Sequence, residues 1–376
     1  MRRLLSVVLA VVVLAVLAYQ YQARIRHQMV DFDVYRTAGA RVVAGQALYR
    51  AEDGHYQFKY LPAFAIAMVP FGAIAADVAR AIWFSLSVVW LAWLVWAAVR
   101  ELPDRHLPAP VLSILAVALM AKFFGHELTL GQANALLGAL FITALVMVGR
   151  RRTMTAAVLI GLSVFVKPYA VIAWPWLAFT RGARTAAVTG AVIVGGLLAP
   201  AAIYGWHGNA DLLTGWFRTV SDSTTPNLLD ADNISLAAMW AKWLGVGRVA
   251  MTLAVVSSVG VVGLVGRLVW RRRQVARPDY VEVAALMLVV PLLSPQGWDY
   301  LLLLGTPAVV CLVDRWRRFG GFWRLVVAVA LATMCLTTFD VMGRTAYGQF
   351  MSLSLVTIAA TGVVAALAHV RSRRLG

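Results

Sequence analysis

Charged residues are scarce in this chain, and acidic residues are the scarcest. Only 14% of its 376 residues are charged, with 17 Asp and Glu against 34 Lys and Arg, whereas a soluble domain carries about 25% charged residues. Hydrophobic residues make up 61%, which is more apolar surface than a water-soluble globule of this size could hide. The composition therefore excludes a soluble enzyme, a disordered chain and a disulfide scaffold.

Several chemical signatures are also missing from the sequence. The two cysteines, Cys311 and Cys335, both lie in apolar runs, where free cysteine acts as a packing residue. No His and Cys cluster has metal-ligand spacing, and there is no nucleotide-binding glycine loop, P-loop or Ser-His-Asp arrangement. We therefore expect no cofactor. The Asp31-Phe32-Asp33 pair leaves a divalent metal open, but such pairs are common by chance and do not indicate one.

Apolar runs of about 13 to 22 residues recur along the chain, the size of helices that span or partly span a bilayer. We predict an all-α polytopic membrane protein that forms a single integral membrane domain over residues 1–376. The first run, Leu4–Ala18, also fits a cleaved signal peptide. The predicted transmembrane helices number about twelve and lie near residues 4–20, 80–99, 111–126, 132–149, 154–167, 169–181, 186–205, 248–269, 281–293, 299–313, 322–338 and 350–369.

The arginines of the short loops predict how the chain crosses the membrane. The formal net charge of +17 could indicate nucleic-acid binding, but the arginines cluster between apolar runs, as the positive-inside rule requires. We therefore expect no nucleic-acid partner, both termini in the cytoplasm, and two outer loops at residues 21–79 and 206–247. The clusters predicted to be cytoplasmic are Arg150-Arg151-Arg152, Arg181 with Arg184, Arg271-Arg272-Arg273, Arg315 with Arg317-Arg318, and Arg371 with Arg373-Arg374.

Some apolar segments are unlike full crossings. The segment 61–75 contains Pro62 and Pro70, and a crossing there would invert every later arginine loop, so we predict an interfacial or re-entrant helix on the outer face. We interpret four short segments as two helical pairs that meet in the outer half of the membrane, where protein or a wet cavity must cover the breaks. These segments, too short to cross about 30 Å of hydrocarbon, are 154–167, 169–181, 281–293 and 299–313.

Two carboxylates, Asp31 and Asp33, begin the first outer loop. A carboxylate at the membrane surface suits a general base that takes a proton from a hydroxyl group, and partial dehydration makes it more basic. Alternatively, acids at a helix start only stabilise the helix dipole. If a helix begins there, the two side chains point about 200° apart and cannot both face one hydroxyl. Both residues are candidate catalytic groups.

Lys167-Pro168 separates two of the short segments. A lysine among apolar membrane residues is costly unless it is paired or hydrated, which makes Lys167 a functional candidate. Pro168 suits the first turn of the following helix, whose positive dipole end then adds to the lysine charge. Together they predict a site for an anion, and a lipid phosphate is the natural anion at this depth. The alternative is a lysine that snorkels to the interface.

Polar side chains at three other turns are candidate substrate ligands. Amides and hydroxyls suit the hydroxyls of a sugar, and a Trp can stack on a sugar face, although amides also cap helices and Trp also marks the membrane interface. The candidates are His126, Glu127, Gln132 and Asn134 between two predicted helices, Asn233 and Ser235 in the second outer loop, and Gln296, Trp298 and Asp299 after Ser294-Pro295.

A series of short motifs follows the first-loop Asp along nearly the whole chain. These motifs are Val34-Tyr35, Ala38-Gly39, Gly45, Leu48-Tyr49, Tyr60-Leu61-Pro62, Gly131-Gln132-Ala133-Asn134, Lys167-Pro168, Asn233-Ile234-Ser235-Leu236 and Ser294-Pro295-x-x-Trp298. Their order resembles glycosyltransferase family 87. The resemblance implies a GT-C fold and a polyprenyl-phosphate sugar donor, with Asp31 as the base and Asp33 as its competitor. The motif tyrosines Tyr35 and Tyr60 become substrate-binding candidates.

The sequence departs from the family at two places. Asp299-Tyr300 stands where family members often have a basic or histidine-containing stretch, and Leu61-Pro62 stands where Pro-Pro is often found. These departures concern the identity of the donor and the linkage more than the fold.

The resemblance implies a membrane glycosyltransferase that moves a sugar, mannose in the best-known members, from a polyprenyl-phosphate donor to a glycolipid or glycan acceptor with inversion. The absence of a nucleotide site fits a lipid-linked donor. The expected setting is a bacterial-type plasma membrane, with lipids around the chain and the site facing outside. Three alternatives stay open: a polyprenyl-phosphoarabinose-dependent arabinosyltransferase, a non-enzymatic lipid-phosphate carrier that needs no base, and a structural subunit of an envelope complex.

Overall fold

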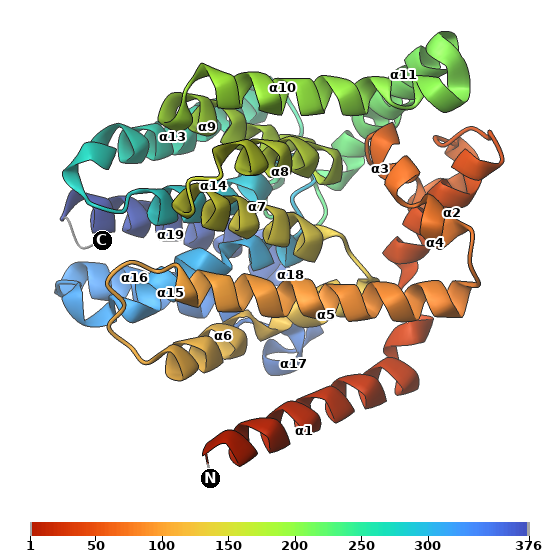
Figure 1. Ribbon diagram of the computed structural model, residues 1–376. Coiled ribbons are helices and arrows are strands. Elements are labelled where there is room, and N and C mark those ends of the chain that lie inside the picture. Colours follow the sequence, from red (N-terminus) through yellow and green to blue (C-terminus); the bar gives the residue numbers. More distant parts are fainter. Residues whose placement is uncertain (1, 374–376) are drawn as a thin grey trace.

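The computed structural model describes residues 2–373, so Arg374, in the last arginine cluster, lies outside the described residues. Within this range every regular element is a helix, which confirms the predicted all-α class. The N-terminal helix α1 (Arg2–Ala23) stands at the edge of the molecule, apart from the main bundle (Figure 1).

The main bundle is built from apolar helices that run side by side (Figure 1). α14 forms its centre, because every residue from Tyr280 to Leu292 is buried. α10 and α13 lie at the periphery and expose apolar side chains such as Val194 and Val256, as surfaces in contact with lipid do. The bundle comprises α5 (Ala76–Arg100), α6 (Ala109–Leu130), α7 (Asn134–Gly149), α8 (Thr153–Val166), α10 (Ala183–Leu198), α13 (Arg248–Trp270), α14 (Asp279–Leu293), α16 (Gly321–Cys335) and α19 (Leu355–Ser372).

Fewer helices are long enough to cross a membrane than the twelve expected. In the described chain four helices, α5, α6, α13 and α19, are long and apolar enough to cross a membrane. α10 and the following helix α11 would make a fifth if their 86° bend interrupts one span. α7, α8 and α16 are apolar but have only 16, 14 and 15 residues, whereas a crossing needs about 20. The helices therefore indicate a membrane-spanning protein without confirming twelve spans.

The predicted span at 186–205 is wrong at its C-terminal end. α10 ends at Leu198, and α11 (Ala201–Asn227) leaves at 86°. The chain can turn here because Pro200 interrupts the run and Gly205 adopts a left-handed conformation with φ of 71°. Much of the predicted second outer loop is therefore helical, as α11 and α12 (Leu236–Leu244).

Both predicted helix breaks are present. α8 ends at Val166, Lys167 is extended, and the chain continues as η3 (Pro168–Ile172) and α9 (Ala173–Arg181). α14 ends at Leu293, and the chain resumes after an irregular stretch as η5 (Asp299–Gly305) and α15 (Thr306–Asp314). Four other short helices follow α9 in the chain: η4 (Arg271–Gln274), η6 (Trp316–Arg318), α17 (Phe339–Met342) and α18 (Arg344–Ser352).

Short helices fill the predicted first outer loop, and none of them could cross a bilayer. The segment 61–75 forms α3 (Pro62–Ala67) and α4 (Val69–Gly72), far short of the roughly 20 residues that a crossing needs. α4 packs tightly on α2 (Val30–Val43), where a Cβ on Gly39 would lie 2.3 Å from the carbonyl oxygen of Met68. The loop also contains η1 (Ile25–His27), α2 (Val30–Val43) and η2 (Ala51–Tyr56).

The two predicted outer loops lie together at one end of the bundle, and arginine clusters lie at the other (Figure 1). The Trp216 indole on α11 donates a hydrogen bond to the Lys59 carbonyl at 3.2 Å, which joins the second loop to the first. We call the opposite end the arginine end. There Arg181 and Arg272 both form ion pairs with Asp279, at 2.7 and 2.8 Å.

Candidate active site

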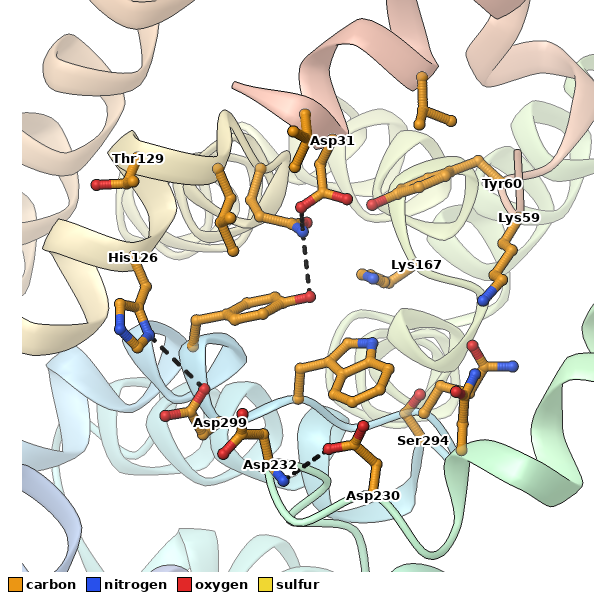
Figure 2. Close-up of a pocket in the computed structure, with 18 of the residues that line it drawn as sticks. Asp31, Lys59, Tyr60, His126, Thr129, Lys167, Asp230, Asp232, Ser294 and Asp299 are labelled. Carbon is orange, nitrogen blue, oxygen red and sulfur yellow. Dashed lines mark hydrogen bonds and ion pairs between the residues drawn. The ribbon is translucent and has the colours of Figure 1, made fainter. Parts of the chain in front are cut away.

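A cavity of about 1480 Å³ opens between α2, the α6–α7 turn, the Lys167 break, α11 and the loop after α14. Figure 2 shows Asp31, Tyr60, Lys59 and Lys167 around one part of it, and His126, Asp299, Asp232 and Asp230 along the opposite part. Segments that are far apart in the sequence thus converge on one cavity. The predicted candidates that line it are Asp31, Tyr35, Tyr60, His126, Gln132, Lys167, Gln296, Trp298 and Asp299.

Asp31 lies in the first turn of α2, and its carboxylate faces the cavity (Figure 2). The Gln132 side-chain amide donates a hydrogen bond to Asp31 Oδ2 at 2.6 Å, which fixes the direction of the carboxylate. Burial raises the pKa of Asp31, while the Gln132 hydrogen bond and the charge of Lys167 oppose that rise. Asp31 is therefore oriented, accessible and more basic than an ordinary aspartate.

Asp33 points elsewhere, because α2 is helical from Val30 onward and two residues of helix turn the side chain by about 200°. Its carboxylate accepts hydrogen bonds from Arg80 Nη2 at 2.8 Å and Nε at 3.1 Å. It does not line the large cavity among the described residues. The structure thus separates the two carboxylates and brings only Asp31 to the cavity.

Gln132 owes its position to the glycine before it. Gly131 ends α6 with φ of 68°, and a Cβ there would lie 2.7 Å from the Cβ of Phe32. The turn can therefore sit directly against α2 only with glycine. The Gln132 amide also donates to the Tyr300 hydroxyl at 3.1 Å, and its oxygen accepts from the Tyr35 hydroxyl at 3.1 Å.

Two tyrosines extend this network along the wall. The hydroxyls of Tyr35 and Tyr60 lie 2.7 Å apart in a hydrogen bond, and the Tyr49 hydroxyl donates to the Tyr60 carbonyl at 2.6 Å. Tyr35 is only 1% exposed. Tyr35 therefore acts mainly on its neighbours, by fixing Gln132 and Tyr60, although it also lines the cavity.

Glu127 and Asn134 lie beneath the cavity wall and are fully buried. The Asn134 side-chain amide donates to Glu127 Oε2 at 3.0 Å, and the Ala135 backbone N–H donates to Oε1 at 2.6 Å. The Glu127 carboxylate thus holds together the two sides of the α6–α7 turn. These predicted ligands support the turn that carries Gln132 and do not line the cavity.

Lys167 projects into the cavity from the break between α8 and η3 (Figure 2). Its amine lies over the Tyr60 ring, 5.1 Å from the centroid, a distance at which a cation attracts an aromatic face. It is within electrostatic reach of Asp31 and of a second lysine, Lys59. The break places a positive charge beside the basic carboxylate, as an anion site would require.

Asn233 and Ser235 hold the scaffold of the opposite wall. Asn233 pairs with Trp298 in an antiparallel bridge, and its amide donates to the Asn227 and Pro295 carbonyls at 2.8 and 2.7 Å. The Ser235 hydroxyl accepts from the Ala238 N–H at 3.0 Å and caps α12. Both residues are fully buried. They therefore position the Ser294–Asp299 loop and do not line the cavity.

The Ser294–Asp299 loop contributes all of its residues except Gly297 to the cavity wall. The Gln296 amide is tied to α11, with donors 3.0 Å from Ser223 Oγ and 3.2 Å from Thr224 Oγ1. Trp298 lines the cavity and is half-buried. The loop is tightly folded, because a Cβ on Gly297 would lie 2.1 Å from the Pro291 carbonyl oxygen.

Acidic groups gather around Asp299. The His126 imidazole Nδ1 lies 3.9 Å from Asp299 Oδ1, and Asp299 is only 3% exposed. Burial, with repulsion from Asp299 and Asp230, raises the pKa of Asp232 to about 6. Among the described residues no group of three or more His, Cys, Asp or Glu is placed to hold a metal ion. This wall instead offers hydrogen-bond acceptors.

Sequence reasoning missed Lys59 and Tyr300, which both line the cavity. Lys59 precedes the Tyr60-Leu61-Pro62 motif directly, and Tyr300 follows Trp298-Asp299, so adjacency to a motif was an available signal for each. In the sequence, Tyr300 stands out only as part of Asp299-Tyr300, one of the two departures from the family pattern. Its hydroxyl accepts from the same Gln132 amide that orients Asp31.

Comparison with known proteins gives one match. The model of glycosyltransferase family 87 matches residues 58–295, more than half of the chain. No curated protein and no solved structure matches the chain. The matched region includes the α6–α7 turn, the Lys167 break and the second loop, and it ends within the Ser294–Asp299 loop.

Proposed function

The chain belongs to glycosyltransferase family 87, and from this premise we propose that it transfers mannose from a polyprenyl-phosphate donor to a hydroxyl group of a glycolipid or glycan acceptor. Its activity is therefore that of a glycosyltransferase, and the donor is what the proposal adds. The observation that carries the proposal is the meeting of Asp31 and Lys167 in one cavity. A carboxylate and an amine side by side are the two groups that a displacement at a sugar phosphate needs.

The reaction is a direct displacement. Asp31 takes the proton of the acceptor hydroxyl as that oxygen forms a bond to the anomeric carbon of the donor sugar. The bond between the anomeric carbon and the phosphate oxygen breaks, and its electron pair leaves with the phosphate. Attack on the face opposite the leaving group inverts the anomeric centre. Gln132 supports this step because its hydrogen bond to Oδ2 aims the carboxylate before substrate arrives.

Lys167 binds the donor phosphate in this scheme. Its amine stands at a helix break and has no hydrogen bond or ion pair to other described residues, so its charge is available to an anion. Charge builds up on the phosphate as the sugar leaves, and a fixed cation in a poorly hydrated site stabilises that change. Apolar residues such as Val166, Val171 and Phe217 also line the cavity, which suits the first isoprene units of a lipid donor.

We place this cavity on the outer face of a bacterial-type plasma membrane. The support is the distribution of charge: the arginine clusters lie at the opposite end of the bundle, and such clusters favour the cytoplasm. Cysteine labelling tests this. A membrane-impermeant thiol reagent should label Glu52→Cys in intact cells and leave Arg151→Cys unlabelled until the cells are opened. Both side chains are exposed, so the reverse pattern would place the cavity in the cytoplasm.

Transfer itself is tested with purified protein in lipid nanodiscs. Radiolabelled polyprenyl-phosphomannose and polyprenyl-phosphoarabinose are each incubated with and without a glycolipid fraction from an envelope. We expect labelled glycolipid from the mannose donor, in an acceptor-dependent manner, and none with Asp31→Asn. Transfer from the arabinose donor alone would replace mannose by arabinose. Absence of transfer from both donors, with the acceptor fraction present, would contradict a polyprenyl-phosphate-dependent transferase.

A further inference from the structure

Two lysine amines, and not one, face the part of the cavity that holds Asp31. Lys59 and Lys167 both line it (Figure 2), and they lie close enough to repel each other electrostatically. Among the described residues neither amine has a hydrogen bond or an ion pair, and the nearby Asp31 carboxylate accepts its hydrogen bond from Gln132. Two adjacent cations without acceptors are costly to keep in a poorly hydrated space.

Lys59 is held in place by its backbone. Its carbonyl accepts the hydrogen bond of the Trp216 indole at 3.2 Å, and the next residue, Tyr60, is fixed through the Tyr49 and Tyr35 hydroxyls. Burial lowers the pKa of the Lys59 amine, and the Asp31 carboxylate opposes that shift. The charged form would therefore gain from a second anion beside it. A lysine that is anchored in this way and needs a counter-charge is typical of a ligand site and not of a mobile surface.

The transfer reaction supplies the anion that fits two cations. The donor is a phosphodiester with one negative charge, and the polyprenyl monophosphate that leaves carries a second charge at neutral pH, since the second pKa of a phosphate monoester is about 6. The proton from the acceptor neutralises Asp31 in the same step. One negative charge therefore moves from the carboxylate to the phosphate during the reaction.

We propose that Lys59 is a second phosphate ligand, which with Lys167 makes a two-lysine site matched to the polyprenyl monophosphate product more closely than to the donor. The proposal rests on the polyprenyl-phosphate function proposed above. Lys167 balances the charge present in the donor, and Lys59 balances the charge that appears as the sugar leaves. Glu127 also acts on Lys167 electrostatically, but it lies under the wall within its own hydrogen bonds, so its contribution stays constant through the reaction.

A third lysine provides a matched control. Lys122 lines the same cavity, but its amine donates a hydrogen bond to the Thr337 carbonyl at 2.9 Å, and the carboxylates that act on it electrostatically are Asp299 and Asp232. It thus lies toward the acidic wall. Lys122→Gln removes the same charge from the same cavity without touching the proposed phosphate site.

The experiment measures equilibrium binding of two water-soluble ligands, a short-chain polyprenyl monophosphate and its mannosyl phosphodiester, to the full-length protein in detergent. The wild type should prefer the monophosphate. Lys59→Gln should weaken monophosphate binding by about 10- to 100-fold, the range for a hydrogen bond to a charged group, and diester binding much less. In turnover, kcat should fall while the donor KM changes little. Lys59→Arg should restore part of the preference, and Lys122→Gln should keep it.

The outcomes separate this inference from the function on which it rests. If the wild type binds both ligands and Lys59→Gln weakens neither, or weakens both equally, Lys59 is not matched to the product and the inference fails alone. If Lys122→Gln caused the same loss of binding, the effect would come from the total charge of the cavity, and the inference about Lys59 would also fail. If the wild type binds neither ligand, the polyprenyl-phosphate function fails and the inference fails with it.

Discussion

The cavity and the arginine end both contain buried or half-buried charged side chains, but the two regions differ in whether these side chains are paired with other residues of the protein. At the arginine end Glu282, which is fully buried, accepts a hydrogen bond from the Trp176 indole at 2.8 Å and forms an ion pair with Arg371 at 3.4 Å. In the cavity, Lys59 and Lys167 have no such partners among the described residues.

The difference shows how to distinguish structural charge from functional charge in a membrane protein. A buried charge whose partners come from the protein stabilises one arrangement of helices, and removing a partner leaves the other stranded. A charge without a protein partner raises the free energy of the ligand-free protein. That free energy falls again when a ligand supplies the counter-charge. Substitutions at the arginine end should therefore change stability, and substitutions at the cavity should change catalysis or binding.

The largest expected effect is at Asp31. Asp31→Asn keeps the size of the side chain and its contact with Gln132 but cannot take a proton, so kcat should fall about 100- to 10,000-fold. The thermal unfolding temperature should stay near that of the wild type. Steady-state assays with saturating donor check the first result, and unfolding scans in detergent check the second.

Asp33→Asn is the matched control for this experiment, because Asp33 pairs with Arg80 outside the cavity and its side chain is 38% exposed. We expect a much smaller loss of activity. Equal and severe losses at both positions would instead require the carboxylates to act together, contrary to their separation on α2.

A loss of similar size, but in stability, is expected at Glu282. Glu282→Gln leaves the guanidinium of Arg371, which is 2% exposed, without its carboxylate, and breaking such a buried pair costs about 3–5 kcal/mol. The unfolding temperature should fall clearly, while kcat per folded molecule should remain that of the wild type. Asp77→Asn, which breaks an exposed pair with Arg80, should be nearly neutral. A catalytic defect in correctly folded Glu282→Gln would erase the contrast between the two regions.

Lys167 should give a loss of binding. Lys167→Ala removes the proposed phosphate ligand and should weaken the donor by about 30- to 1000-fold, from roughly 2–4 kcal/mol for a poorly hydrated ion pair. Lys167→Arg should keep part of the affinity. Because the amine has no hydrogen bond or ion pair within the described residues and contacts only the Tyr60 ring, the free enzyme should lose little stability. Unchanged donor KM and kcat in Lys167→Ala would show that the lysine merely reaches for the interface.

The smallest effect is expected at Ser235. This residue tests whether the hydrogen-bond partners of a side chain or its distance from the cavity decide if a substitution changes stability or catalysis. Ser235 lies next to the cavity wall, yet its hydroxyl is committed to the N-terminus of α12. Ser235→Ala should cost about 1 kcal/mol of stability, the usual value for a lost N-cap, with little change in kcat. A large catalytic loss at constant stability would mean that proximity to the cavity outweighs pairing.

The sequence predicted the helices better than it predicted which of them cross the membrane. Apolar runs and arginine clusters located the bundle and both helix breaks, because these features are local in the chain. They did not predict the 86° bend between α10 and α11 or the helical character of α11, since an apolar run continues to Ile203 and the amphipathic stretch beyond it was read as a loop. Short helices such as α8 also carry apolar composition without the length of a span.

For the site, the sequence predicted which residues are involved better than it predicted the role of each one. The sequence identified Asp31, Gln132 and Lys167 as polar residues at turns, and the structure brings all three to one cavity. It could not tell that Glu127 and Asn233 face inward, because both sit at turns where either direction is possible. That distinction depends on tertiary contacts such as the bond between the Asn233 amide and the Pro295 carbonyl, 62 residues away in sequence.

The close fit of Gly131 against Phe32 has a consequence for the order in which the protein is made. Asp31 is synthesised early, but the amide that aims it belongs to Gln132, 101 residues later. A nascent chain that has just completed α5 therefore carries the carboxylate without its orienting partner, and α2 can reach its final position only after the α6–α7 turn has been made. Because glycine at position 131 leaves room for Phe32, the turn and α2 can come together at this late stage, and Asp31 is held in its final direction only once they have docked.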